Sequence, residues 1–83
     1  MRLNKSIINK LNCDTSNGFY YYGIIDGYEI YRIISTHGGK RGNPKYFAID
    51  TKERIEWIRG LERINSIRLF NPEPQLISLT HLS

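Results

Sequence analysis

Tyrosine is concentrated in one part of the sequence, where its rings could contact nucleic-acid bases or a partner protein. Tyr20, Tyr22 and Tyr31 occur within one aromatic and β-branched stretch, and Tyr46 occurs in the next. On a sheet these rings would form a platform on which bases stack at about 1–3 kcal/mol each, or rigid anchors for a protein. The alternative is that the first helix covers this surface and the rings belong to the core.

Positive charge gathers close to these tyrosines. The chain has a formal net charge of +4, from 12 Lys and Arg against 8 Asp and Glu, which favours an acidic partner such as nucleic acid. Cations in a glycine-rich loop and on one helix side would contact phosphates, with an affinity that falls with salt. The alternative is a solvated loop and a solvated helix side. The cations expected at the binding surface are Lys40, Arg41, Lys45, Lys52, Arg59 and Arg63.

Residues that could catalyse a reaction are few and isolated. His37 lies beside glycines, where a histidine could do acid–base chemistry, but no second acid or base follows at a telling spacing. Cys13 is the single cysteine, and His and Cys do not occur at zinc-ligand spacing. We therefore expect a protein that binds rather than catalyses, with no catalytic residue, metal or cofactor. A small nuclease centred on His37 is the remaining alternative.

The elements that must position these side chains begin with a short helix and a hairpin. Apolar residues recur on one side of 4–12, and Asn4 can serve as the N-cap. The stretch 19–35 is rich in strand formers and is interrupted by Asp26-Gly27, the dipeptide favoured in a two-residue type I′ turn. The sequence therefore predicts two antiparallel strands joined at this turn.

This turn sets the expected strand pairing. The pairs run from Ile25–Tyr28 at the turn through Tyr22–Tyr31 to Tyr20–Ile33. Because side chains alternate between faces, one face would carry Phe19, Tyr21, Ile25, Tyr28, Ile30, Arg32 and Ile34. The other would carry Tyr20, Tyr22, Ile24, Glu29, Tyr31 and Ile33. The first is typical of a core, so the second is the candidate binding surface.

A third strand and a second helix are expected after the loop 36–44. Residues 45–49 would add Phe47 and Ile49 to the core face and Tyr46 to the other. Asp50 would cap a helix, with Glu53 completing an Asp-x-x-Glu capping box. Its buried arc would comprise Trp57, Ile58, Leu61 and Ile64, opposite a mostly basic side.

The fold class that follows is α+β, in the order α-β-β-β-α. A three-stranded antiparallel sheet would pack on the amphipathic helix, within a single domain spanning 1–83. Prolines in 71–74 would end the helix, and 75–82 would form a fourth strand, a partner-binding strand or a frayed end. We treat 71–83 as an extended tail in the last two cases.

Residues 19–66 resemble the AP2 and integrase arm-type DNA-binding domains, in which three strands precede a helix. The likeness is carried by Ile49-Asp50-Thr51-Lys52-Glu53-Arg54-Ile55, which is similar to the opening of that helix. In that family the sheet face contacts the major groove. The resemblance therefore implies that the contact residues include Tyr20, Tyr22, Tyr31, Tyr46 and Lys45.

Two functions remain open. The first is a small non-enzymatic module that binds nucleic acid, DNA more than RNA, from a phage or mobile element, since the chain is rich in residues with A/T-rich codons. The second is a phage-type inhibitor or modulator of a host protein or nucleoprotein complex, with an anti-defence or takeover role. A homodimer through the sheet edge or the C-terminal tail is compatible with both.

The expected location is the cytoplasm, or the host cytoplasm for a viral protein. The sequence begins without the apolar run of a signal peptide, and no stretch approaches the roughly 18 apolar residues of a membrane span. A single cysteine also fits a reducing compartment better than an oxidising one.

Overall fold

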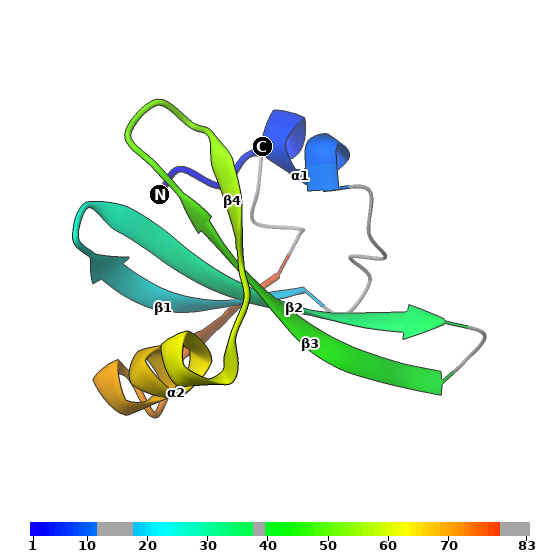
Figure 1. Cartoon of the computed structure of the whole chain (residues 1–83). Helices are drawn as coiled ribbons and strands as arrows, with labels where there is room; N and C mark the ends of the chain where they lie inside the picture. The colour runs from blue at the N-terminus through cyan, green and yellow to red at the C-terminus, as the bar shows by residue number, and fades with distance from the viewer. Residues whose placement is uncertain (12–17, 38–39, 79–83) are drawn as a thin grey trace.

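The structure, a computed structural model, describes residues 1–11, 18–37 and 40–78, with side chains described outside 35–37 and 40–43 (Figure 1). Cys13 and His81 lie outside the described residues. The elements follow in the order α1 (Lys5–Leu11), β1 (Phe19–Ile25), β2 (Tyr28–His37), β3 (Lys40–Ile49), β4 (Ile55–Ile58), α2 (Leu61–Phe70) and β5 (Gln75–Ile77). The α+β class is therefore confirmed.

The strands form one antiparallel sheet of five strands, in the order β4-β3-β2-β1-β5, rather than the three strands expected. The two helices lie on opposite sides of this sheet (Figure 1). On the α1 face, α1 packs on a cluster that includes Phe19, Tyr31, Ile33, Phe47, Ile49 and Ile77. On the α2 face, Ile67 of α2 packs on Tyr22, Ile30, Tyr46, Ala48 and Ile58. The sheet thus has a buried cluster on each face.

The first helix begins where the sequence predicts. Asn4 caps it, because its Oδ1 accepts a hydrogen bond of 3.0 Å from the backbone N–H of Ile7. Leu3, Ile7 and Leu11 are buried against the sheet. This helix therefore covers the α1 face.

The hairpin turn at Asp26-Gly27 is also confirmed. Asp26 and Gly27 have φ values of 53° and 84°, as a type I′ turn requires at both central positions. The pairs nearest the turn follow the predicted register, up to Gly23 opposite Ile30.

Beyond Gly23 the predicted register is wrong, because a β-bulge between Tyr21 and Gly23 adds a residue to β1. Tyr21 therefore lies opposite Tyr31, and Tyr20 lies opposite Arg32. A shift of one residue moves side chains to the other face of a sheet. The expected tyrosine surface is consequently divided between the two faces.

The four tyrosines separate as follows. Tyr31 lies on the α1 face with its side chain fully buried, so it cannot contact a ligand. Tyr20, Tyr22 and Tyr46 lie on the α2 face. Tyr22 and Tyr46 are buried as well, at 2% and 4% exposure, in the cluster on which α2 packs. The alternative that the tyrosines belong to the core is thus correct for three of the four, although the first helix covers only Tyr31.

The prediction of a helix that begins at Asp50 is wrong. Asp50 instead occupies a turn, where its Oδ1 accepts hydrogen bonds of 2.9 Å from the backbone N–H groups of Lys52 and Arg54. These bonds, the backbone bond from Arg54 first, lower the pKa of the Asp50 carboxyl. The chain then enters β4, which pairs with β3. The segment that carries the DNA-binding-domain resemblance therefore forms a turn between two strands, and the resemblance itself stays a prediction.

The second helix begins later than expected, after Gly60, whose φ is 98°. Leu61, placed in the buried arc by its helical spacing, is 73% exposed. The helix ends before Pro72, as the sequence predicts. The prediction of a further strand in 75–82 is confirmed for Gln75–Ile77, which pairs with β1.

Gly18 brings the start of β1 close to β5. Its φ is +80°, and a Cβ there would lie 2.9 Å from the carbonyl oxygen of Ile77. Gly27 has a similar φ of +84°, but a Cβ at this position would have nothing within 4 Å. The two glycines thus share a backbone conformation and differ in their surroundings.

We expect Gly18→Ala to lower the free energy of unfolding more than Gly27→Ala. Both variants incur about 1–2 kcal/mol for a side chain in the left-handed region. Only Gly18→Ala adds a steric clash, of about 1–3 kcal/mol. Urea unfolding measures both, and equal losses would show that the contact with β5 is unimportant.

Candidate functional site

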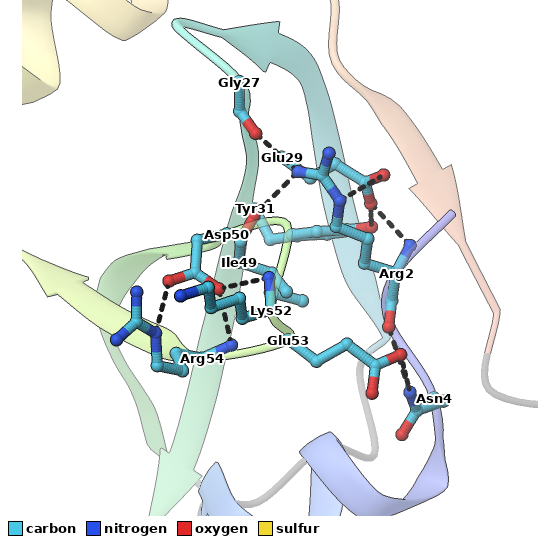
Figure 2. Close-up of polar contacts among 10 residues, drawn as sticks. All are labelled: Arg2, Asn4, Gly27, Glu29, Tyr31, Ile49, Asp50, Lys52, Glu53 and Arg54. Carbon is cyan, nitrogen blue, oxygen red and sulfur yellow. Dashed lines mark hydrogen bonds and ion pairs between the residues drawn. The ribbon is translucent and has the colours of Figure 1, made fainter.

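The N-terminus is held to the hairpin by polar contacts that Figure 2 shows. The carboxylate of Glu29 accepts a hydrogen bond of 2.7 Å from the backbone N–H of Arg2 and one of 2.6 Å from the Tyr31 hydroxyl. The Arg2 guanidinium donates to the carbonyl oxygens of Gly27 and Ile49, at 2.6 and 3.1 Å. Each of these groups is bonded within the protein, so the cluster is a structural contact rather than a binding site.

Burial changes the titration of two tyrosines. The pKa of Tyr31 is raised by burial first, and then by its hydrogen bond to Glu29 and the charge of that carboxylate. Burial and a hydrogen bond with Tyr46 raise the pKa of Tyr22 to about 12. Both hydroxyls therefore stay protonated in the folded protein at a pH where an exposed tyrosine ionises.

We expect the protein to lose stability as the pH rises from about 10 to 12. In this range the unfolded chain releases the Tyr22 proton while the folded protein retains it, so ionisation favours unfolding. Each such tyrosine lowers the free energy of unfolding by about 1.4 kcal/mol per pH unit. Urea unfolding at several pH values measures this slope. Tyr22→Phe should make the slope shallower, and an unchanged slope would contradict the assignment.

A concave pocket of about 740 Å³ lies between the sheet and α2. Strands β1 and β2, helix α2 and the segment after that helix all contribute to it. Its lining residues are Tyr20, Tyr22, Arg32, Asn65, Arg68, Leu69, Asn71, Pro72 and Pro74. None of these residues is acidic, so two arginines give the pocket a positive charge. We call it the Arg32/Arg68 pocket.

Arg32 is stacked against tyrosine rings in this pocket. Its guanidinium carbon lies 4.4 Å from the ring centroid of Tyr20 and 5.9 Å from that of Tyr22. Such contacts hold the cation over an aromatic face. Its Nε is buried and has no hydrogen-bond partner among the described residues. Because a buried N–H without an acceptor costs about 1–3 kcal/mol, this group favours a ligand that supplies one.

Within the described part of the chain, neither pocket arginine is neutralised by a neighbouring carboxylate. The ion pairs found there involve other arginines, and none includes Arg32 or Arg68. Arg68 is exposed on α2, and its charge and that of Arg32 both act to lower the pKa of Tyr22. The two positive charges therefore both act on Tyr22.

Asn71 fixes the wall of the pocket. Its side-chain amide donates a hydrogen bond of 3.1 Å to the Tyr22 carbonyl oxygen, and its Oδ1 accepts one of 3.0 Å from the backbone N–H of Glu73. These bonds tie the end of α2 to β1. The pocket shape is thus set by contacts within the protein.

The structure places three of the predicted tyrosines near this pocket. Tyr20 and Tyr22 line it, and Tyr46 is buried behind Tyr22, with ring centroids 5.7 Å apart. Tyr31 lies on the opposite face of the sheet, so it takes no part in the pocket.

The predicted cations do not form one stripe. Lys45 is exposed on the α1 face, with its Nζ 5.9 Å from the ring centroid of Trp57. Lys52 lies in the β3–β4 turn, and Arg59 lies between β4 and α2. Arg63 forms an ion pair of 3.7 Å with Glu56. The backbones of Lys40 and Arg41 begin β3, and their side chains fall outside the description.

Sequence reasoning missed Arg32, Arg68, Asn65 and Asn71. It placed Arg32 on the face opposite Tyr20, and it assigned no role to Arg68 although it ended the helix beyond that residue. Gly23, at φ 107° directly after three tyrosines, was the available signal for the bulge, since glycine inside a strand often marks one.

A second hollow, of about 530 Å³, lies further along the α2 face and differs in charge. It is lined by apolar side chains that include Ile30 and Ile67, and by the paired charges of Glu56 and Arg63. Asp26 lines it too, so two carboxylates are present for one arginine, and this hollow attracts an anion less than the Arg32/Arg68 pocket does.

Comparison of the chain with protein-family models, with curated proteins and with solved structures finds no match. Within the described ranges 1–11, 18–37 and 40–78, no helix has the length and apolar character needed to cross a membrane. The same residues contain no group of His, Cys, Asp or Glu side chains that could hold a metal ion. Function is therefore inferred from the geometry of the site alone.

Proposed function

We propose that the protein is a non-enzymatic nucleic-acid-binding module that uses the Arg32/Arg68 pocket. The observation that carries this proposal is a pocket with the half-buried Tyr20 ring, no acidic lining residue, and two arginines that form no ion pair among the described residues. Guanidinium groups match phosphate oxygens in charge and geometry, and aromatic rings match bases. Nucleic acid supplies both chemistries in one ligand.

The β2–β3 ribbon supports the same function. Beyond the residues that pair with β1 and β4, these two strands continue alone, as far as the pair His37–Lys40 (Figure 1). Lys40 and Arg41 lie at its end, where cations would be within reach of the phosphates of a nucleic acid bound along the ribbon. With a net charge of +4, such a ribbon would add phosphate contacts to those of the pocket. We infer DNA in preference to RNA, and a phage or mobile-element origin with a cytoplasmic location.

Titration of labelled duplex and single-stranded DNA and RNA at several salt concentrations tests this function. We expect the logarithm of the binding constant to fall linearly with the logarithm of the salt concentration. Lys40→Ala combined with Arg41→Ala should weaken all sequences similarly, because phosphate contacts carry no sequence information. Absence of binding at low salt, or a binding constant that does not change with salt concentration, would contradict the proposal.

A second candidate function is favoured by the exposed apolar residues of α2. Leu61, Leu69 and Phe70 are 73%, 84% and 57% exposed, and exposed apolar patches mark protein contacts. Arg63 and Arg68 lie on the same helix, so the matching occupant is a host protein with an apolar anchor flanked by carboxylates. This would be a phage-type inhibitor or modulator of a host complex.

Pull-down from a bacterial lysate with and without nuclease separates the two functions. A stoichiometric protein partner that survives nuclease and is lost with Leu69→Ala/Phe70→Ala would favour the second. Loss of all partners after nuclease would favour the first.

A further inference from the structure

We propose that the Arg32/Arg68 pocket binds one unstacked nucleotide, so that the protein selects single-stranded over duplex nucleic acid. This inference rests on the proposed function and adds the form of nucleic acid that is bound. Three properties of the pocket carry it: its concave shape, the stack of Arg32 on Tyr20, and the position of its hydrogen-bonding groups.

The shape of the pocket suits a single nucleotide. Its volume of about 740 Å³ lies within the range of about 300–1,000 Å³ found for small-molecule sites. Pro72, Pro74 and residues of α2 line it together with residues of β1 and β2. A base held in a duplex is stacked and paired, and it reaches such a recess only after extrusion, which is energetically unfavourable. A base in a single strand does not incur this cost.

The stack of Arg32 on Tyr20 offers a platform for that base. Unstacked bases are bound in proteins by aromatic rings and by the planes of arginine guanidinium groups. Here both planes are present, with the guanidinium carbon 4.4 Å from the Tyr20 centroid. A base in the pocket would extend this stack.

The polar groups around the platform match the rest of a nucleotide. Arg68 is exposed on the wall and can contact a phosphate, and the Asn65 side chain, one turn earlier on α2, can donate to or accept from a base edge. The half-buried Arg32 guanidinium, whose Nε has no partner among the described residues, lines the pocket and can donate to a phosphate or base oxygen. Positive charge and base contacts thus lie within one recess.

Fluorescence anisotropy with one labelled oligonucleotide, free and in a duplex with its complement, tests the inference. We expect about 5- to 150-fold tighter binding of the free strand, because one stacked base alone contributes a factor in that range. A nucleoside monophosphate should displace the strand at lower concentration than the nucleoside or inorganic phosphate. Displacement equally well by inorganic phosphate would overturn the proposal and indicate a simple phosphate site.

Matched variants separate this inference from the proposed function. Tyr20→Ala should reduce the preference for the free strand, whereas Tyr20→Phe should keep it, because the ring remains. Tyr28→Ala is the control, since Tyr28 is an exposed tyrosine that lines the second hollow. Equal binding of strand and duplex, unaffected by Tyr20→Ala, would overturn the inference and leave the proposed function standing. No binding of either form at low salt would overturn both.

Discussion

The Arg32→Ala/Arg68→Ala double variant should bind oligonucleotides at least about 100-fold more weakly than the unaltered protein. Each arginine can make a charge-assisted hydrogen bond to a phosphate, worth about 1.5–3 kcal/mol. Two such bonds amount to about 3–6 kcal/mol, and every 1.4 kcal/mol changes affinity tenfold. Equilibrium titration at fixed salt measures the loss.

The matched control is Lys52→Ala/Arg59→Ala, which removes two exposed cations outside the pocket. Both double variants lower the net charge from +4 by two units, so general electrostatic attraction falls equally. We expect the control to weaken binding by less than about tenfold. Equal losses in the two variants would show that the pocket has no special role.

Folding must be separated from binding in this test, because Arg32 is half-buried and packs on Tyr20. Arg68→Ala alone serves this purpose, since Arg68 is exposed and its removal should leave the thermal midpoint nearly unchanged. If Arg68→Ala melts like the unaltered protein and still binds with full affinity, the pocket is not the binding site.

Glu29→Ala should cause the largest loss of stability of any substitution of an acidic residue on this sheet, about 3–5 kcal/mol. Glu29 is buried and accepts hydrogen bonds from Arg2 and Tyr31. Removing its carboxylate leaves the Arg2 backbone N–H and the buried Tyr31 hydroxyl without their acceptor, and it removes the ion-pair partner that lies 3.8 Å from the Arg2 Nε. Against a total of about 5–15 kcal/mol for a small domain, this loss is large. Urea unfolding measures it.

Two further variants serve as comparisons for Glu29→Ala. Glu53→Ala removes an exposed glutamate whose contact with Asn4, at 3.4 Å, is long, and we expect a change below about 0.5 kcal/mol. Tyr31→Phe removes the hydrogen bond to Glu29 but keeps the carboxylate, and it should cost about 1.5–3 kcal/mol. A Glu29→Ala variant as stable as Glu53→Ala would refute the structural role of this carboxylate.

The parts of the fold that depend on local chemistry were predictable from the sequence. Asn4 caps α1 and Asp26-Gly27 forms the hairpin turn, because both act on backbone groups within a few residues. The bulge at Tyr22 is different. Tyr20, Tyr21 and Tyr22 fit either face equally well, so the choice depends on the clusters that form on both sides of the sheet.

The prediction of a helix at Asp50 failed for a related reason. An aspartate that accepts backbone N–H groups stabilises a helix start and a turn alike, so its chemistry did not distinguish them. Adjacent Trp57 and Ile58 suggested one side of a helix. In β4 they point to opposite faces, and both faces are covered, so both side chains are accommodated.

The candidate site could be predicted only in part. Tyr20 and Tyr22 were identified because aromatic residues in a strand are a recognisable pattern. Arg32 and Arg68 meet only because α2 folds back over β1 and β2, and no spacing in the sequence records that contact. The cations of the sequence prediction were chosen by proximity along the chain, and the fold disperses them.

The measurement that tests the central claim most directly is a ¹H–¹⁵N nuclear magnetic resonance titration with a single-stranded oligonucleotide. It should include the arginine side-chain Nε–H signals as well as the backbone amides. We predict that the Arg32 Nε–H signal shifts on binding, because this buried group gains an acceptor, together with amides of Tyr20 and of α2 around Arg68. Shifts confined to other parts of the chain, with the Arg32 signal unchanged at saturation, would contradict the assignment of the Arg32/Arg68 pocket as the nucleic-acid site.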